Sequence, residues 1–152
     1  MGTRHLQITI NKEGETKLSQ YGQWDGYPDG QGVDILEFLS NNNLEEYLKE
    51  VNKLREPTDE ENKIIDNDEK WATNYPYLSR DCGAKIHKLI LENKVKFVGL
   101  CSLEEARKWC EGFYTIDFQK NTFTSEFGGK KKVYKLNKLP SKEKYLKDMG
   151  KF

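Results

Sequence analysis

The sequence predicts an α+β domain whose mostly antiparallel sheet comes from an N-terminal hairpin and C-terminal strands, with a central helical segment packed on it. Three observations support this prediction: apolar residues alternate near the start of the chain, recur at helical spacing in the middle, and alternate again towards the end. The 152 residues are the usual size of one domain. We expect residues 1–140 to form that domain and residues 141–152 to form a lysine-rich tail or short helix.

The N-terminal hairpin is predicted by two alternating segments. In residues 4–10, Leu6, Ile8 and Ile10 lie on one side and polar residues on the other, which is typical of a half-buried strand. Residues 12–15 supply a turn, and residues 16–23 alternate again. The second strand therefore runs directly into the residues that follow and holds them at the end of the sheet.

Helices are predicted for the middle of the chain over residues 32–39 and 44–54, the second of them ended by Pro57. Residues 58–71 are acidic and poor in apolar residues, which indicates a weak helix and a surface flap. A further helix, capped by Ser79, is expected to place Cys82 and Ile86 on its inner face.

The second half of the chain returns to strands after one more helix. We expect a short apolar strand at residues 95–100, and the capping-box spacing of residues 102–105 then opens a helix through Trp109. Alternation predicts three C-terminal strands, at residues 114–118, 123–127 and 133–136, followed by the tail or short helix after Pro140.

Composition narrows the classes of function. With 25 basic and 25 acidic residues the formal net charge is zero, so no global field favours nucleic acid, and we expect none as a partner. No apolar run approaches the length of about 20 residues that a membrane span needs. Three cysteines without a leader do not suggest a disulfide framework. We therefore expect a cytoplasmic protein.

Charge is unevenly distributed along the chain. Residues 45–69 contain ten acidic and four basic residues, whereas residues 130–152 contain nine lysines and two acidic residues. We expect these two regions to face each other or the solvent. The alternative is that the basic tail meets an anionic partner, and lysines interleaved with Phe127 and Tyr134 leave nucleic-acid binding as a minor possibility.

Residues 21–32, YGQWDGYPDGQG, depart most from ordinary sequence. They combine four glycines, a proline, two aspartates and three large aromatic residues. Ordering such a loop is costly, which favours a binding or catalytic role. The alternative is a rigid structural corner whose rings fill the end of the core.

The predicted ligand- or partner-binding residues come from this loop and from one segment later in the chain. The two rings of the loop would supply contact area, and its polar groups would supply recognition. Arg80 and Asp81 would belong to the same site if the start of their helix meets the loop. The residues are Gln23, Trp24, Asp25, Tyr27, Gln31, Arg80 and Asp81.

Several kinds of ligand are disfavoured. The glycines precede a helix start, but their spacing is not that of a phosphate loop, and Asp25, Asp29 and Asp34 would repel an anion. A neutral polar or cationic ligand suits the loop better. The spacing of Cys82 and His87 predicts no metal site, and we expect no cofactor.

Two carboxylates leave an enzymatic alternative open. Asp25, between Trp24 and Gly26, could be desolvated enough to act as an acid or base, or could hold the loop as an Asx turn. Asp81 has the same ambiguity beside Arg80, where a pairing at a helix start is usually structural.

The chain resembles a family of small uncharacterised proteins of phages, bacteria and fungi that have an MGTR start and a YGQWDGYPxGQG loop. The resemblance is carried by MGTR at residues 1–4, residues 21–32, LSRDCGA at 78–84 and CEGFYTID at 110–117, and it extends to about Leu136. Cys82 stands where the family is expected to have Thr, and Gly112 and Phe113 where it has Trp and Ala. A catalytic hydroxyl at position 82 is therefore not implied.

Together these observations predict a phage-type binding module that acts in the host cytoplasm. The phage association of the family implies an anti-defence inhibitor that binds a host protein or a small polar ligand. The first alternative is a small hydrolase- or transferase-like enzyme with Asp25 or Asp81 as acid or base. The second is nucleic-acid binding or mimicry, through the basic tail or the acidic middle.

Overall fold

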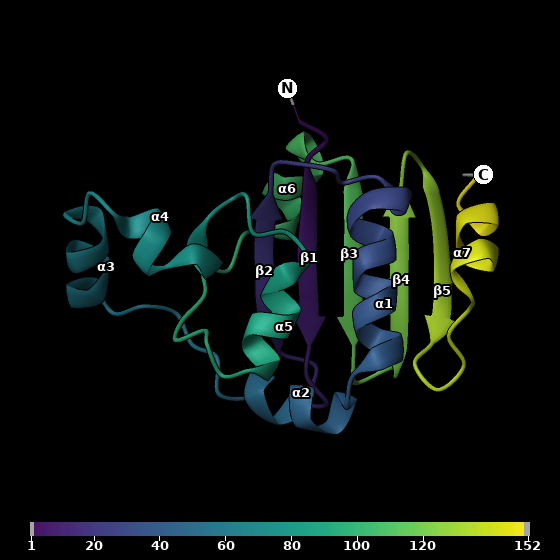
Figure 1. Cartoon of the computed structure of the whole chain (residues 1–152), viewed down its shortest axis with the longest axis horizontal. Coiled ribbons are helices and arrows are strands. Elements are labelled where there is room, and N and C mark those ends of the chain that lie inside the picture. The colour runs from purple at the N-terminus through teal and green to yellow at the C-terminus, as the bar shows by residue number, and fades with distance from the viewer. Residues whose placement is uncertain (1, 151–152) are drawn as a thin grey trace.

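A five-stranded sheet organises the computed structural model, which describes residues 2–150 (Figure 1). The strand order is β2-β1-β3-β4-β5, and neighbouring strands are antiparallel except for the parallel pair β1 and β3. This is the predicted α+β fold with a mostly antiparallel sheet. The strands are β1 (His5–Ile10), β2 (Thr16–Gly22), β3 (Gly112–Asp117), β4 (Thr122–Phe127) and β5 (Lys130–Lys135).

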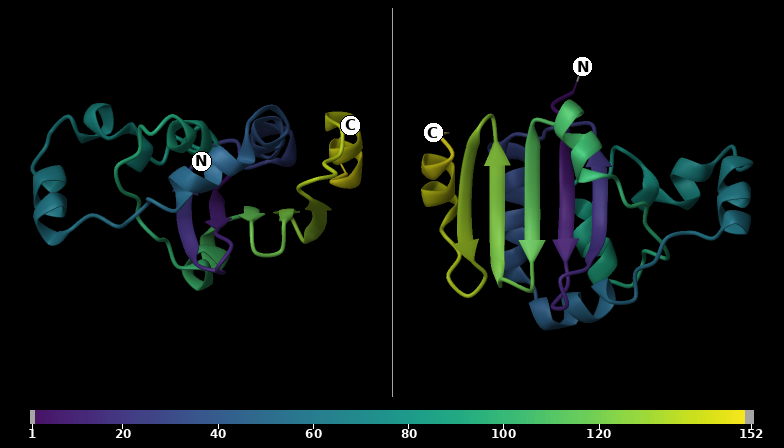
Figure 2. Two further views of the ribbon diagram at one scale, coloured as in Figure 1. Left: turned by 90° about the horizontal axis from the view of Figure 1, so that it is seen from below. Right: turned by 180° about the vertical axis from the view of Figure 1, so that it is seen from behind.

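The helices cover the two faces of the sheet unequally. Figures 1 and 2 show α1, α2, α5 and α7 on one side of the sheet, α6 alone on the other, and α3 and α4 projecting beyond β2. The helices are α1 (Val33–Asn41), α2 (Leu44–Val51), α3 (Asp59–Asp66), α4 (Trp71–Asn74), α5 (Lys85–Leu91), α6 (Leu103–Trp109) and α7 (Lys142–Asp148).

The main core lies between the sheet and the helices of the covered face. It contains Ile35 of α1, Ile86 of α5 and Phe123 of β4. Helix α7 also contributes to it, because Tyr145 is fully buried. The expected short helix after Pro140 therefore packs into the core rather than forming a free tail, and residues 151–152 of that prediction lie outside the described residues.

Strand β1 corrects the prediction of a half-buried strand. Leu6 and Ile8 are buried as expected, but the polar residues of the other side, His5, Gln7 and Thr9, are buried too. They lie on the covered face, because Gln7 contacts α5 and Thr9 contacts α2 through hydrogen bonds. Alternation thus placed the side chains on the right faces but misidentified the polar side as solvent-exposed.

Two predicted elements differ from the structure. Residues 95–100 form no regular strand, because the Val98 amide donates to the Arg55 carbonyl and only Leu100 forms a bridge, to Ser19 of β2. The helix expected from Ser79 begins only at Lys85, because Gly83 takes a left-handed conformation with φ of 59°. Cys82 consequently lies in a turn before α5.

Helix ends and caps also differ in detail. Helix α2 stops at Val51 and the chain turns on to a buried Leu54, several residues before Pro57. Ser102 caps α6 by accepting from the Glu105 amide, but the complete capping box belongs to Thr58 and Glu61 at α3. That box stabilises α3 although none of the residues of the helix is buried. The predicted surface flap is therefore this exposed helix.

The two oppositely charged regions do not face each other. The acidic residues of α3 lie at one end of the molecule, and the lysines of β5 and α7 lie at the other end (Figure 1). Of the two expected arrangements, the regions take the second, because they do not pair and both face the solvent.

Candidate functional site

The loop that joins β2 to α1 is fixed to three other segments of the chain. The Gln23 amide donates to the Arg80 carbonyl at 3.0 Å, and the Gly26 amide donates to the Thr3 carbonyl at 2.9 Å. The hydroxyl of Tyr114 donates to the Gly26 carbonyl at 2.6 Å. Residues Pro28–Gly32 then form one turn of π-helix that leads into α1. The loop backbone is therefore held rigidly at the end of the sheet, as predicted.

Asp25 holds the loop through its backbone and not through its side chain. Its φ of 57° lies in the left-handed region, and its carbonyl accepts from the Gln31 amide at 2.9 Å. Within residues 2–150 no hydrogen bond reaches its exposed carboxylate. The expected Asx turn is therefore not what shapes the loop, and the carboxylate faces solvent.

Two predicted recognition residues are engaged inside the protein. The Gln31 amide group donates to the Trp24 carbonyl at 3.1 Å, and its side-chain oxygen accepts from the Ala84 amide at 2.8 Å. It thereby binds a free amide at the start of α5. The side-chain oxygen of Gln23 accepts from the hydroxyl of Tyr21. Both glutamines brace the loop instead of pointing to a partner.

The remaining predicted residues are all exposed, and the ring of Tyr27 lies 5.6 Å from that of Phe127 of β4. The indole N–H of Trp24 donates to the Asp81 carboxylate at 2.6 Å, so the segment that carries Arg80 and Asp81 does meet the loop. Trp24 is 44% exposed and Tyr27 is 43% exposed, which argues against rings that merely fill the core. We call the exposed residues Trp24, Asp25, Tyr27, Arg80 and Asp81 the aromatic corner.

Below this loop runs a buried chain of polar side chains that sequence reasoning missed. His87 Nε2 lies 2.9 Å from Gln7 Oε1, and Gln7 Nε2 lies 3.1 Å from His5 Nδ1. In the other direction, the Tyr47 hydroxyl lies 2.7 Å from His87 Nδ1 and 2.9 Å from Thr9 Oγ1. All five residues are fully buried. The chain thus links β1 to α2 and α5.

The amide of Gln7 fixes the protons of both histidines. Its oxygen requires a proton on His87 Nε2, and its N–H requires a lone pair on His5 Nδ1. The proton of neutral His5 is then on Nε2, which has no hydrogen-bond partner within the described residues. Burial lowers the pKa of His5 to about 4 and that of His87 to about 3. Both histidines are therefore neutral and structural at pH 7.

The cysteines show no features of a reactive or metal-binding site. Burial raises the pKa of Cys82 and of Cys110 to about 11, so each remains a thiol at pH 7. Across residues 2–150 no three His, Cys, Asp or Glu side chains are grouped to hold a metal ion. Over the same residues no helix is both long enough and apolar enough to cross a bilayer.

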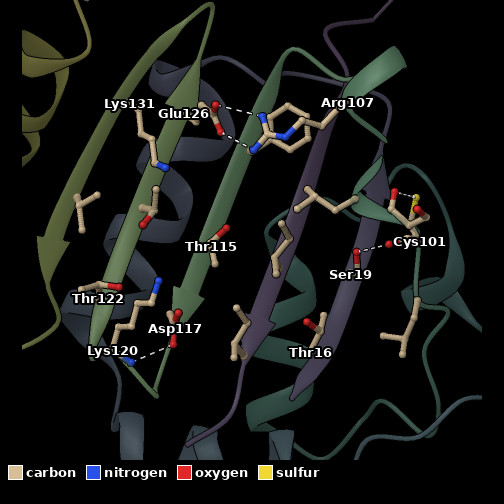
Figure 3. Close-up of a pocket in the computed structure, with 18 residues that line it drawn as sticks. Thr16, Ser19, Cys101, Arg107, Thr115, Asp117, Lys120, Thr122, Glu126 and Lys131 are labelled. Atoms are coloured by element: carbon tan, nitrogen blue, oxygen red, sulfur yellow. Dashed lines mark hydrogen bonds and ion pairs between the residues drawn. The ribbon is translucent and has the colours of Figure 1, made fainter. Parts of the chain in front are cut away.

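A broad hollow on the described surface lies away from the predicted residues, on the face of the sheet that only α6 covers. It has a volume of about 650 Å³ (Figure 3). Its floor includes Ile8, Ile10, Thr115, Thr122 and Thr124, and its walls include Leu100, Leu103, Lys120, Lys131 and Val133. We call these residues the open-face groove. The alternating threonines of residues 115–124 were a signal for it that sequence reasoning missed.

Comparisons with models of protein families, with curated proteins and with solved structures find no match for this chain. The resemblance in the loop motifs therefore stays an expectation, and the functional argument depends on the geometry.

Proposed function

We propose that this protein is a binding module that recognises a partner protein through the aromatic corner. The observation that carries the proposal is the exposure of Trp24 and Tyr27, 44% and 43%, on a loop whose backbone is fixed to three other segments. Large rings that stay in water without conformational freedom are the usual anchors of protein interfaces.

Rigidity supports binding because the entropy of ordering the loop is spent during folding. The internal bonds of Gln31 and the left-handed Asp25 hold the loop in one conformation before any partner arrives. Association then loses less freedom than it would with a mobile loop. The charged groups of Asp25, Arg80 and Asp81 would supply the polar rim that surrounds such anchors.

The biological role that fits this module is an inhibitor which occupies a host protein in the cytoplasm. Phage origin and anti-defence action rest on the resemblance of the loop motifs alone. A small polar ligand at the same corner is less well supported, because Gln23 and Gln31, which would read it, are already bonded internally.

The enzymatic alternative has weaker support at this corner. The Asp81 carboxylate already accepts the indole N–H of Trp24 at 2.6 Å, and Asp25 is exposed. A general acid or base must be positioned against a bound substrate, and neither an internally bonded nor a solvent-facing carboxylate is held in that way here. Nucleic-acid mimicry by the acidic α3 is likewise not favoured by any feature of the corner.

The proposal is tested by replacing both rings, Trp24→Ala with Tyr27→Ala. The tagged protein would be used to capture partners from a bacterial lysate, and the strongest candidate would be purified and titrated by calorimetry. We expect the double variant to weaken the affinity by about a thousandfold, because interface aromatic anchors each contribute about 2 kcal/mol or more.

A matched control is the double variant Trp71→Ala with Trp109→Ala, since these two rings are also exposed, at 40% and 56%, but lie on α4 and α6. It should bind like the wild type. If the corner variant keeps its fold and still binds as tightly as this control, the aromatic corner is not the interface.

A further inference from the structure

The open-face groove exists because α6 covers only one row of its sheet face. In the strand register, Leu6 of β1 is aligned with Phe113 of β3, and Phe113 is aligned with Glu126 of β4. Helix α6 packs on this row through Ala106, while the side chain of Arg107 lies over the Phe113 ring at 4.4 Å. The two rows below have no helix over them, as Figure 2 shows from behind.

These two uncovered rows mix apolar and hydroxyl side chains. Ile8 is aligned with Thr115, and Thr115 with Thr124; in the lower row Asp117 is aligned with Thr122. The three threonine side chains make no hydrogen bonds among the described residues. Their hydroxyls are therefore available to a ligand beside the apolar surface of Ile8.

The walls add apolar surface that no part of the described chain covers. Leu100, from the segment that precedes α6, and Leu103, the first residue of α6, are 43% and 47% exposed. Val133 of β5 is 57% exposed on the opposite side. All three line the same hollow of about 650 Å³, which is within the range of small-molecule sites.

The charges of the groove leave two cations without a partner. Both carboxylates are engaged: Glu126 accepts two hydrogen bonds from Arg107, each of 3.1 Å, and Asp117 accepts the backbone amides of residues 119 and 120. Lys120 and Lys131 have no ion-pair partner within residues 2–150. Figure 3 shows their side chains reaching toward one another over β4.

We infer that the open-face groove binds an amphipathic organic anion. Its carboxylate, sulfonate or phosphate lies between Lys120 and Lys131 and accepts from the hydroxyls of Thr122 and Thr124, while its apolar part lies along Ile8 towards Leu100 and Leu103. The charges of the groove fit a small anion, because the ammonium groups of Lys120 and Lys131 can be balanced by one or two negative charges on the ligand. This ligand site is separate from the aromatic corner and does not depend on it.

The test uses 8-anilinonaphthalene-1-sulfonate, a fluorescent dye with an aromatic body and one sulfonate, on the full chain in its folded state. N-phenyl-1-naphthylamine, which has the same body without the sulfonate, is the neutral comparison. We expect saturable binding of the anionic dye and weaker binding of the neutral one. The double variant Lys120→Gln with Lys131→Gln should weaken the anionic dye by about tenfold and leave the neutral dye unchanged, since charge-assisted hydrogen bonds are lost.

The control is Lys142→Gln with Lys147→Gln, which removes the same charge from exposed positions of α7 and should bind the anionic dye like the wild type. A second variant, Thr115→Tyr, fills the floor and should weaken both dyes. No saturable binding to the folded protein, or equal losses in the α7 control, would overturn the inference. A concentration-dependent dimer that excludes the dye would assign the groove to a second copy and would overturn it as well.

Discussion

The two faces of the sheet treat polar side chains in opposite ways. On the covered face, His5, Gln7 and Thr9 of β1 are completely buried. On the open face, Thr115 and Thr124 are half-buried beside apolar side chains that remain in contact with solvent. The same sheet thus carries a polar interior on one side, hydrogen-bonded except at His5 Nε2, and a partly apolar surface with free hydroxyls on the other.

The difference lies in the partners that each face meets and not in residue type. Helices α2 and α5 bring Tyr47 and His87 to the covered face, and these two side chains complete the hydrogen bonds of Gln7 and Thr9. Burial of polar groups is tolerated when their bonds are made. Where no helix brings such partners, hydroxyl and ammonium groups stay available, and that availability is what a ligand site requires.

The largest effect is expected from breaking the buried chain at its centre with His87→Leu. The substitution leaves the Gln7 side-chain oxygen without a partner in a fully buried place, and the Tyr47 hydroxyl keeps only its bond to Thr9. An unsatisfied buried group costs about 1–3 kcal/mol and a lost hydrogen bond about 1 kcal/mol, so the free energy of unfolding should fall by about 2–4 kcal/mol. Urea denaturation at neutral pH measures the change, and His87→Gln, which can restore one bond, should lose less. Equal stability of His87→Leu and wild type would show that the chain does not hold the covered face together.

A second effect, of comparable size, is a loss of stability in mild acid. The chain has two histidines, and burial lowers the pKa of His5 to about 4 and of His87 to about 3. Between about pH 6.5 and those values the unfolded state binds protons that the folded state cannot, so stability falls as the pH falls. Each histidine contributes a slope of about 1.4 kcal/mol per pH unit in this window.

Denaturation with urea at about pH 7 and about pH 5 tests this slope, because unperturbed carboxylates titrate mainly below that window. The variant His87→Gln should show a smaller fall in stability than the wild type, although it is less stable at both pH values. A wild-type stability that does not change across the window would mean that the two histidines are protonated in the folded state.

Sequence periodicity was sufficient to predict the elements whose apolar residues repeat at a regular spacing within one short segment. The strands around residues 4–10 and 123–127 and the helix at residues 32–39 follow directly from alternation and helical spacing. Their arrangement was not predictable in the same way, because the parallel pairing of β1 with β3 joins residues about a hundred positions apart. Nothing local in residues 95–100 showed that Val98 would bond to Arg55 and so prevent a strand.

The candidate site was predictable in position but not in detail. Composition pointed to residues 21–32, and the structure places Trp24 and Tyr27 on the surface, with Trp24 bonded to Asp81. The internal role of Gln31 depends on the left-handed Gly83, a distant residue whose conformation has no signal in the loop itself. The buried chain escaped detection because polar residues that alternate with apolar ones usually face water.

The smallest expected effect, and the most direct comparison of the two faces, comes from one isosteric change made on adjacent strands. Thr9→Val on β1 removes a fully buried hydroxyl that lies 2.9 Å from the Tyr47 hydroxyl, whereas Thr115→Val on β3 removes one that makes no hydrogen bond among the described residues. The first should cost about 1 kcal/mol of unfolding free energy and the second less than about 0.5 kcal/mol. Combining each with Tyr47→Phe in urea denaturation should give a coupling energy for Thr9 only, because Thr115 lies on the other face. Equal losses of unfolding free energy for Thr9→Val and Thr115→Val would contradict this comparison. They would mean that hydrogen bonding of the threonine hydroxyls does not distinguish the two faces of the sheet.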